Sequence, residues 1–334
     1  LVEAVKRKLK EKGNWLLIYD NLEKFKEVQK FFPCDESWGR GKIIITTRDG
    51  NIRGNPYINN LIQIEELSPK ERFDLFIKIM NNGYQTPLTE TQKEQTRKFL
   101  EAIPPFPLDI SSAARYLKST NITYEKYLQY LNEPDEIFEI LQKNILKETS
   151  DYSKTRYSIL RLSLKRISDI HNDFPSLLLF VGLLGPENIP RSLLGSFKQE
   201  VTVDSFFYYL KKYSLINSDS SSPFNGSEYF SIHRSIQEII LAYCARMYKK
   251  NQDLKVLEEI EISFERYLSD TLSKEDFEKM KVLADHAEAF LKHGNFLHHK
   301  IQTRIKAELG KIYFYLGNFL KAKKNLHESF DSLN

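Results

Sequence analysis

The sequence of 334 residues contains no loop of the form G-x-x-x-x-G-K-[ST], the glycine-rich segment whose backbone N–H groups surround nucleotide phosphates. It also lacks a nucleophile elbow, a zincin motif and a dinucleotide fingerprint. These absences exclude the common catalytic motifs. Any chemistry must therefore be argued from single side chains and from their order along the chain.

Cysteine and long apolar runs are also scarce. Cys34 and Cys244 lie far apart and match no metal-ligand spacing, which favours a reduced, cytoplasmic environment. The most apolar stretch, Leu177 to Leu184, is far shorter than the roughly 20 residues that span a bilayer. The sequence therefore predicts a soluble cytoplasmic protein without membrane contact.

A surplus of one charge is missing as well. The chain has 49 basic and 45 acidic residues, a formal net charge of +4, and no concentrated basic stripe, so nucleic acid is not favoured as a partner. Several histidines gather near the C-terminus, but no carboxylate or cysteine completes a ligand pattern with them. They are His286, His293, His298, His299 and His327.

The first 65 residues alternate between strand and helix patterns. Trp15–Tyr19 and Ile43–Ile45 are continuous apolar runs, typical of strands buried on both faces of a parallel sheet. A helix is expected over Leu22–Phe32 and a third short strand over Leu61–Ile64. This order predicts an open parallel α/β sheet in residues 1–65.

Helical spacing takes over at Ser68, which can cap a helix with Pro69 at its first position and Glu71 in the capping-box position. Further helices are expected over 90–102, 108–119 and 123–131. Residues 66–135 therefore read as a small all-helical domain.

Residues 136–248 combine helices with two short strands. Leu215–Asn217 and Tyr229–Ile232 flank the polar loop 218–226, after helices expected over 138–146, 157–170, 176–185 and 206–213. This combination predicts a winged-helix domain over 136–248, and residues 249–334 are expected to be helical only.

Asp20 follows the first strand, at the edge where an open α/β sheet places its ligand. A carboxylate there can hold Mg²⁺ beside nucleotide phosphates, directly or through water. The next residue, Asn21, carries an amide, which cannot act as a general base, so hydrolysis would be slow. The alternative is that Asp20 is a structural turn residue.

Thr46, Thr47 and Arg48 follow the second strand. They supply two hydroxyls and a guanidinium whose planar fork matches phosphate oxygens. The alternative is an ordinary surface arginine at a strand end. The residues at the ends of the two strands follow each other in the order Asp-Asn and then Thr-Thr-Arg, and this order favours a nucleotide site.

Five segments in this order resemble the motifs of the NB-ARC class of signal-transducing STAND ATPases. They are Trp-Leu-Leu-Ile-Tyr-Asp-Asn from Trp15, Ile-Ile-Ile-Thr-Thr-Arg from Ile43, Ile-Glu-Glu-Leu-Ser from Ile64, Pro-Phe-Pro-Leu-Asp from Pro105 and Phe-Ser-Ile-His-Arg-Ser-Ile-Gln from Phe230. The resemblance implies a P-loop nucleotide-binding domain, a helical domain, a winged-helix domain and a repeat array. It also implies ADP or ATP with Mg²⁺ as cofactors of the intact protein.

The resemblance assigns roles to two further residues. Pro107 matches the proline that packs on adenine, although Pro105 stands where glycine is usual and Phe106 where leucine is usual. His233 matches the histidine that holds the β-phosphate of ADP in the closed state, and Arg234 follows it where many members have aspartate. The alternatives are a helix-start proline and a strand-end histidine.

The C-terminal segment is similar to a tetratricopeptide repeat. The spacing of L-G-x₂-Y followed by alanine and a large apolar residue is met, with Lys306 in place of the usual tryptophan. The matching residues are Leu309, Gly310, Tyr313, Gly317, Ala322 and Leu326. Such repeats imply protein partners, and at least three are usually needed to bury a core.

The chain begins with Leu1 in a basic amphipathic pattern and ends in a helical one, so we expect a fragment cut from a longer protein. The leading hypothesis is an ADP/ATP-dependent switch whose opening lets nucleotide-binding domains self-associate, a slow ATPase when intact. These 334 residues, without the phosphate loop, should bind little or no nucleotide and be inactive. The alternatives are a nucleotide-independent interaction scaffold and, more weakly, a winged-helix DNA-binding regulator.

Overall fold

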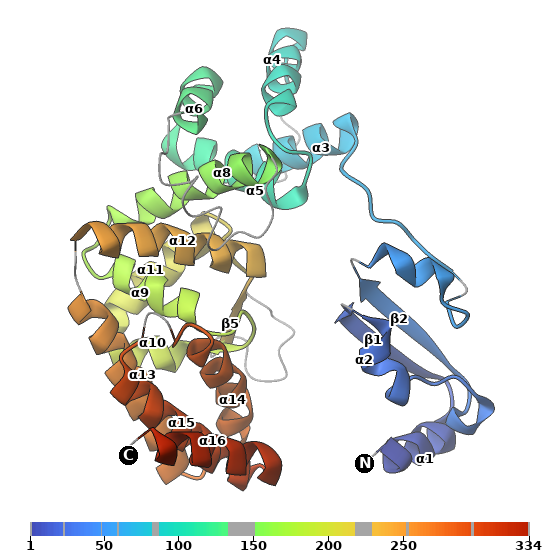
Figure 1. The fold of residues 1–334 in the computed structure, drawn as a ribbon. Coiled ribbons are helices and arrows are strands. Elements are labelled where there is room, and N and C mark those ends of the chain that lie inside the picture. The colour runs from blue at the N-terminus through green and yellow to red at the C-terminus, as the bar shows by residue number, and fades with distance from the viewer. Residues whose placement is uncertain are drawn as a thin grey trace. The chain divides into compact units, whose positions relative to one another are not determined.

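The computed structural model describes residues 2–22, 24–47, 49–58, 60–81, 87–132, 151–217, 229–251, 254–294 and 297–332. The chain divides into two compact units, Leu1–Glu65 and Glu66–Asn334 (Figure 1). The described part is mostly helical, with a small parallel sheet in the first unit. None of its helices has the length and apolar character needed to cross a membrane.

The first unit is built on two parallel strands. β1 (Trp15–Leu22) pairs with β2 (Gly41–Thr47) in the parallel direction that the sequence predicted, and the pairing runs from Trp15 opposite Gly41 to Tyr19 opposite Ile45. Helix α1 (Val2–Lys12) precedes β1, and the short α2 (Phe25–Val28) lies between the strands. The Trp15 indole N–H donates to the Trp38 carbonyl at 2.8 Å and ties β1 to the loop before β2.

Three predictions for this unit were wrong. The strands are not buried on both faces, since Leu16, Ile18 and Ile44 are at least half exposed. The Phe25–Phe32 segment packs on the opposite face of the sheet, where the Tyr19 ring lies 5.8 Å from Phe32. The expected helix over 22–32 is reduced to α2 and one 3₁₀ turn, Gln29–Phe31, since β1 continues to Leu22. Residues 60–68 are all described and contain no strand, so the third expected strand does not form.

The second unit begins with four helices, all of which the sequence predicted. They are α3 (Pro69–Met80), α4 (Glu90–Glu101), α5 (Pro107–Thr120) and α6 (Tyr124–Leu131). The Ser68 capping box forms: the Glu71 N–H donates to Ser68 Oγ at 3.3 Å, and the Glu71 carboxylate accepts the Ser68 N–H at 2.8 Å. Phe76, Phe99 and Tyr127 are buried among these helices.

The middle of this unit combines helices with a three-stranded antiparallel sheet of order β3-β5-β4. The strands are β3 (Ile189–Pro190), β4 (Ile216–Asn217) and β5 (Tyr229–Ile232), and the helices are α8 (Asp151–Ser168), α9 (Phe174–Leu183), α10 (Arg191–Phe197), α11 (Glu200–Lys212) and α12 (Arg234–Asn251). The sequence predicted β4 and β5 but missed β3, α10 and α12. The helix expected over 138–146 and the loop 218–226 lie outside the described residues.

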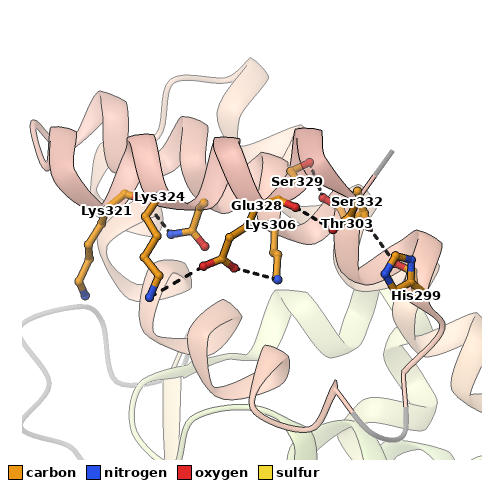
Figure 2. A network of polar contacts seen from close by, with 9 residues as sticks. His299, Thr303, Lys306, Lys321, Lys324, Glu328, Ser329 and Ser332 are labelled. Carbon is orange, nitrogen blue, oxygen red and sulfur yellow. Dashed lines mark hydrogen bonds and ion pairs between the residues drawn. The ribbon is translucent and has the colours of Figure 1, made fainter. Parts of the chain in front are cut away.

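The last part is helical, as predicted, with α13 (Leu254–Ser273), α14 (Phe277–Leu291), α15 (His299–Tyr315) and α16 (Phe319–Asp331). α15 and α16 pack closely: a Cβ on Gly310 would lie only 2.7 Å from Leu326 Cγ. Gly317, with φ of +75°, lies in the turn between them. Polar contacts also join the pair, because Lys306 Nζ lies 2.9 Å from Glu328 and Ser329 Oγ donates to the Thr303 carbonyl at 2.9 Å (Figure 2).

Candidate functional site

A buried ion pair joins the Pro105–Asp109 segment to helix α8. Arg156 Nε lies 3.1 Å from one Asp109 carboxylate oxygen, and an Arg156 terminal nitrogen lies 2.9 Å from the other. The Asp109 side chain is fully buried, and that of Arg156 is 19% exposed. The two-point geometry fixes the plane of the guanidinium and leaves part of it at the surface.

Local sequence explains how this segment is held. Pro107 is the first residue of α5, where its missing N–H costs nothing and its fixed φ favours the helix. This places Asp109 in the first helical turn, where a carboxylate is favoured by the helix dipole. The Phe106 ring centre lies 5.6 Å from the Arg156 guanidinium carbon, so the ring supports the cation from another side. Pro107 itself is exposed.

Burial dominates the titration of this carboxyl group. Loss of solvent raises the pKa of Asp109 to about 6, and the charge and hydrogen bonds of Arg156 oppose that rise without cancelling it. The ion pair is therefore a positioning device rather than a large source of stability. Its effect is to hold a guanidinium at a set place on α8.

His233 lies within electrostatic range of the same guanidinium. Burial lowers the pKa of His233, the positive charge of Arg156 lowers it further, and Glu238 acts in the opposite direction. Its Nδ1 accepts the backbone N–H of Ser235 at 3.2 Å, so the neutral ring carries its proton on Nε2. The imidazole is therefore neutral near pH 7 and has one N–H to donate.

His233 also stands immediately before α12, and its carbonyl accepts the N–H groups of Ile236 and Gln237. A helix N-terminus presents backbone N–H groups and a partial positive charge, which favour anions. Arg234, next in sequence, lies 3.5 Å from Glu238 in an exposed pair. The guanidinium of Arg156, the Nε2–H of His233 and this helix end are each suited to a phosphate oxygen.

The strand tips of the first unit bring together two of the predicted residues. Between Tyr19–Ile45 and Leu22–Thr47 the register shifts, so that Asp20 and Asn21 stand opposite Thr46 alone. The Thr46 hydroxyl donates to the Asp20 carboxylate, and Asp20 is exposed. The Asn21 side chain and all of Arg48 lie outside the described residues.

Thr47 has a structural role. Its hydroxyl donates to the Leu22 carbonyl at 2.6 Å and accepts the Asp49 N–H at 2.9 Å. These bonds hold the end of β2 against β1. Within the described part of the chain, no group of three or more histidine, cysteine, aspartate or glutamate side chains could hold a metal ion.

Sequence reasoning named Pro107 and His233 but missed Arg156. Arg156 precedes the buried Leu160 and Leu164 by one and two helical turns, so it continues the apolar face of α8. A cation in line with buried leucines needs a buried partner, and this spacing was the available signal. The roles assigned to Asp20, Asn21, Thr46, Thr47, Arg48, Pro107 and His233 stay predictions.

Comparison with known proteins gives distant similarities to solved structures alone. No family model and no curated protein matches the chain. Among solved structures, a signal transduction ATPase with numerous domains (STAND) protein with a tetratricopeptide repeat sensor, from Pyrococcus horikoshii, aligns with a TM-score of 0.40 and 13% identity. The alignment covers 99% of this chain and 51% of that protein, so the chain spans about half of its length. A TM-score at this level does not show a shared fold.

Proposed function

We propose that this chain is part of an ADP/ATP-dependent signal-transduction switch of the STAND type. The observation that carries the proposal is that Arg156, which is ion-paired to Asp109 of the Pro105–Asp109 segment, also acts electrostatically on His233. The resemblance to NB-ARC proteins implies an adenine contact for Pro107 in this segment and a phosphate contact for His233. A guanidinium, an imidazole N–H and a helix N-terminus all bind phosphate oxygens, which supports a diphosphate ligand.

In this proposal Pro107 packs on the adenine and His233 donates its Nε2–H to the β-phosphate of ADP. Asp20 holds Mg²⁺, with Asn21, Thr46, Thr47 and Arg48 beside the phosphates of the nucleotide. The hydrogen bond between Thr46 and Asp20 supports the strand-tip assignment, since it orients the carboxylate. Asn21 offers no general base, so turnover is slow and the nucleotide state, not its hydrolysis rate, carries the signal.

The proposed domains are the C-terminal part of a P-loop nucleotide-binding domain over 1–65, a helical domain over 66–135, a winged-helix domain over 136–248, and adaptor helices with the start of a repeat array over 249–334. The sheet order β3-β5-β4, with α10 and α11 between β3 and β4, supports the winged helix. Exchange of ADP for ATP would open these domains and allow self-association through the nucleotide-binding domain.

The test uses the full-length protein that contains these residues. After denaturation, the purified protein should release ADP on ion-exchange chromatography, and light scattering should show a larger assembly with ATP than with ADP. Release of no nucleotide, together with the same mass in both nucleotides, would overturn the proposal. Since these 334 residues contain no phosphate loop, they should bind ADP with a Kd weaker than about 1 mM, which corresponds to about 4 kcal/mol.

A nucleotide-independent interaction scaffold is the second candidate. The α15–α16 pair packs as a tetratricopeptide-like hairpin, and it leaves Phe314, Phe319, Leu320 and Phe330 more than half exposed. Exposed large apolar side chains on a helical pair favour a protein partner. The two candidates separate on one result: a scaffold keeps its partners when nucleotide is removed by apyrase, whereas a switch changes its assembly.

A further inference from the structure

A basic pocket opens between helices α3, α5 and α11 of the second unit, and none of its lining residues belongs to the Arg156–His233 group. Its volume is about 750 Å³. Four cationic side chains and two hydroxyls line it, with Leu75 and Ile79 as an apolar wall. The polar residues are Lys78, Arg115, Lys118, Lys212, Ser111 and Ser119. None of the described residues that line the pocket is acidic.

Two of these cations have a structural explanation. Lys78 lies in the last turn of α3 and Lys118 in the last turn of α5, where positive charge offsets the helix dipole. Lys118 Nζ also donates to the Ile79 carbonyl at 2.6 Å, near the end of α3. Helix capping therefore accounts for the placement of these two lysines.

The other two cations are not explained by capping. Arg115 Nε is buried and has no hydrogen-bond partner among the described residues. Lys212 Nζ lies 5.7 Å and 6.0 Å from the ring centres of Tyr209 and Tyr213, and these rings hold the ammonium group without neutralising it. The buried Arg115 donor has no acceptor among the described residues, and the Lys212 ammonium is held there by aromatic rings alone, so an anion fits as the partner of both groups.

We propose that this pocket binds a small organic polyanion carrying two or more phosphate groups. The Arg115 fork and the Lys212 ammonium contact phosphate oxygens, because a guanidinium binds them at two points and an ammonium acts as a point charge. Ser111 can donate to a remaining oxygen, whereas the Ser119 hydroxyl donates to the Tyr116 carbonyl at 2.9 Å; Leu75 and Ile79 face the organic part of the ligand. The site shares no residue with the Arg156–His233 group and is independent of the proposed nucleotide switch.

Isothermal titration of the chain with pyrophosphate at low salt tests this pocket. Pyrophosphate should bind more tightly than orthophosphate by at least about tenfold. R115M and K212M should each weaken pyrophosphate binding about tenfold, the usual size of one charge-assisted hydrogen bond. If R115M fails to fold, R115K keeps the positive charge but removes the planar guanidinium that binds phosphate at two points. It should still weaken pyrophosphate binding several-fold.

K211M is the matched control, because Lys211 is exposed, adjacent to Lys212 and outside the pocket lining. It removes the same charge and should change the Kd less than about twofold, as expected for a screened surface charge. H233A should leave pyrophosphate binding unchanged, which separates this pocket from the nucleotide site. No pyrophosphate binding, or equal losses in K211M and K212M, would overturn the proposal.

Discussion

Asp109 and Arg156, 47 residues apart in sequence, form a two-point ion pair in which the carboxylate is fully buried and the guanidinium reaches the surface. The pair joins the first turn of α5 to α8, and its guanidinium acts electrostatically on His233. Arg156 stabilises the ionised form of Asp109, whereas burial destabilises it. The pair therefore matters mainly for where it holds Arg156.

Removing one member of this pair should be costly. We expect D109N to lower the free energy of unfolding by about 3–5 kcal/mol, because it leaves Arg156 partly buried without its counter-charge. Urea unfolding followed by circular dichroism measures this change. E90Q is the control: it breaks the exposed Lys93–Glu90 pair and should cost less than about 1 kcal/mol. Equal losses in the two variants would contradict a structural role for the buried pair.

Replacing both members should be much less harmful. The double variant D109L/R156M removes two buried charges together and substitutes apolar side chains of similar volume. Its stability should lie close to that of the unmodified chain, since desolvation offsets most of the attraction in such pairs. A loss equal to or larger than that of D109N would show that the pair is a net source of stability.

His286 predicts how stability depends on pH. It is fully buried, its Nδ1 accepts the Gly185 N–H at 3.1 Å, and its Nε2–H donates to the Asn188 carbonyl at 3.0 Å. Burial lowers the pKa of His286 below its unfolded value of about 6.5. Below about pH 6.5 the unfolded chain therefore binds more protons at this histidine than the folded chain does. The contribution of neutral His286 to the free energy of unfolding is fully present above about pH 6.5 and is lost as the pH falls.

The variant H286Q should flatten this pH dependence between about pH 6.5 and 5, as measured by urea unfolding at several pH values. It should also lower the stability at pH 7.5, because the two hydrogen bonds are disturbed. H327Q changes an exposed histidine and should leave the profile unchanged. An H286Q profile parallel to that of the unmodified chain would show that His286 does not contribute to the acid sensitivity.

The close packing at Gly310 predicts that the α15–α16 pair does not tolerate a side chain at this position. An added Cβ would lie 2.7 Å from Leu326 Cγ and 3.2 Å from its backbone nitrogen, so G310A should destabilise α15–α16 by about 1–3 kcal/mol. The matched control is G195A in α10, where nothing lies within 4 Å of the new Cβ. There alanine should stabilise the helix by about 0.5–1 kcal/mol.

Thermal melts of both glycine variants, with L326A and G310A/L326A, complete the test. If the clash is with Leu326, the double variant should lose less than the sum of the two single losses. Additive losses would mean that the helices do not approach each other closely at Gly310.

The sequence predicted most helices because their signals are local. Ser68, Pro69 and Glu71 specify a helix start without help from the rest of the fold, and the capping box forms as expected. The strand Ile43–Ile45 likewise follows from a β-branched run. Periodicity and caps are enough for such elements.

The failures came from properties that depend on distant partners. The apolar run around Ile62 predicts a strand, but a strand needs an edge to pair with, and residues 60–68 pair with neither β1 nor β2. The burial of Leu16 and Ile18 could not be read from their apolarity alone. Arg156 was missed because its partner, Asp109, lies in another helix.

The most direct measurement of the central claim is the ADP affinity of the full-length protein with and without His233. If Nε2–H of His233 contacts a phosphate, H233A should raise the Kd for ADP by about tenfold and leave the affinity for adenosine unchanged. The control H171A removes an exposed histidine that pairs with Asp173 and should change neither. Equal ADP affinity in H233A, H171A and the unmodified protein would contradict the account.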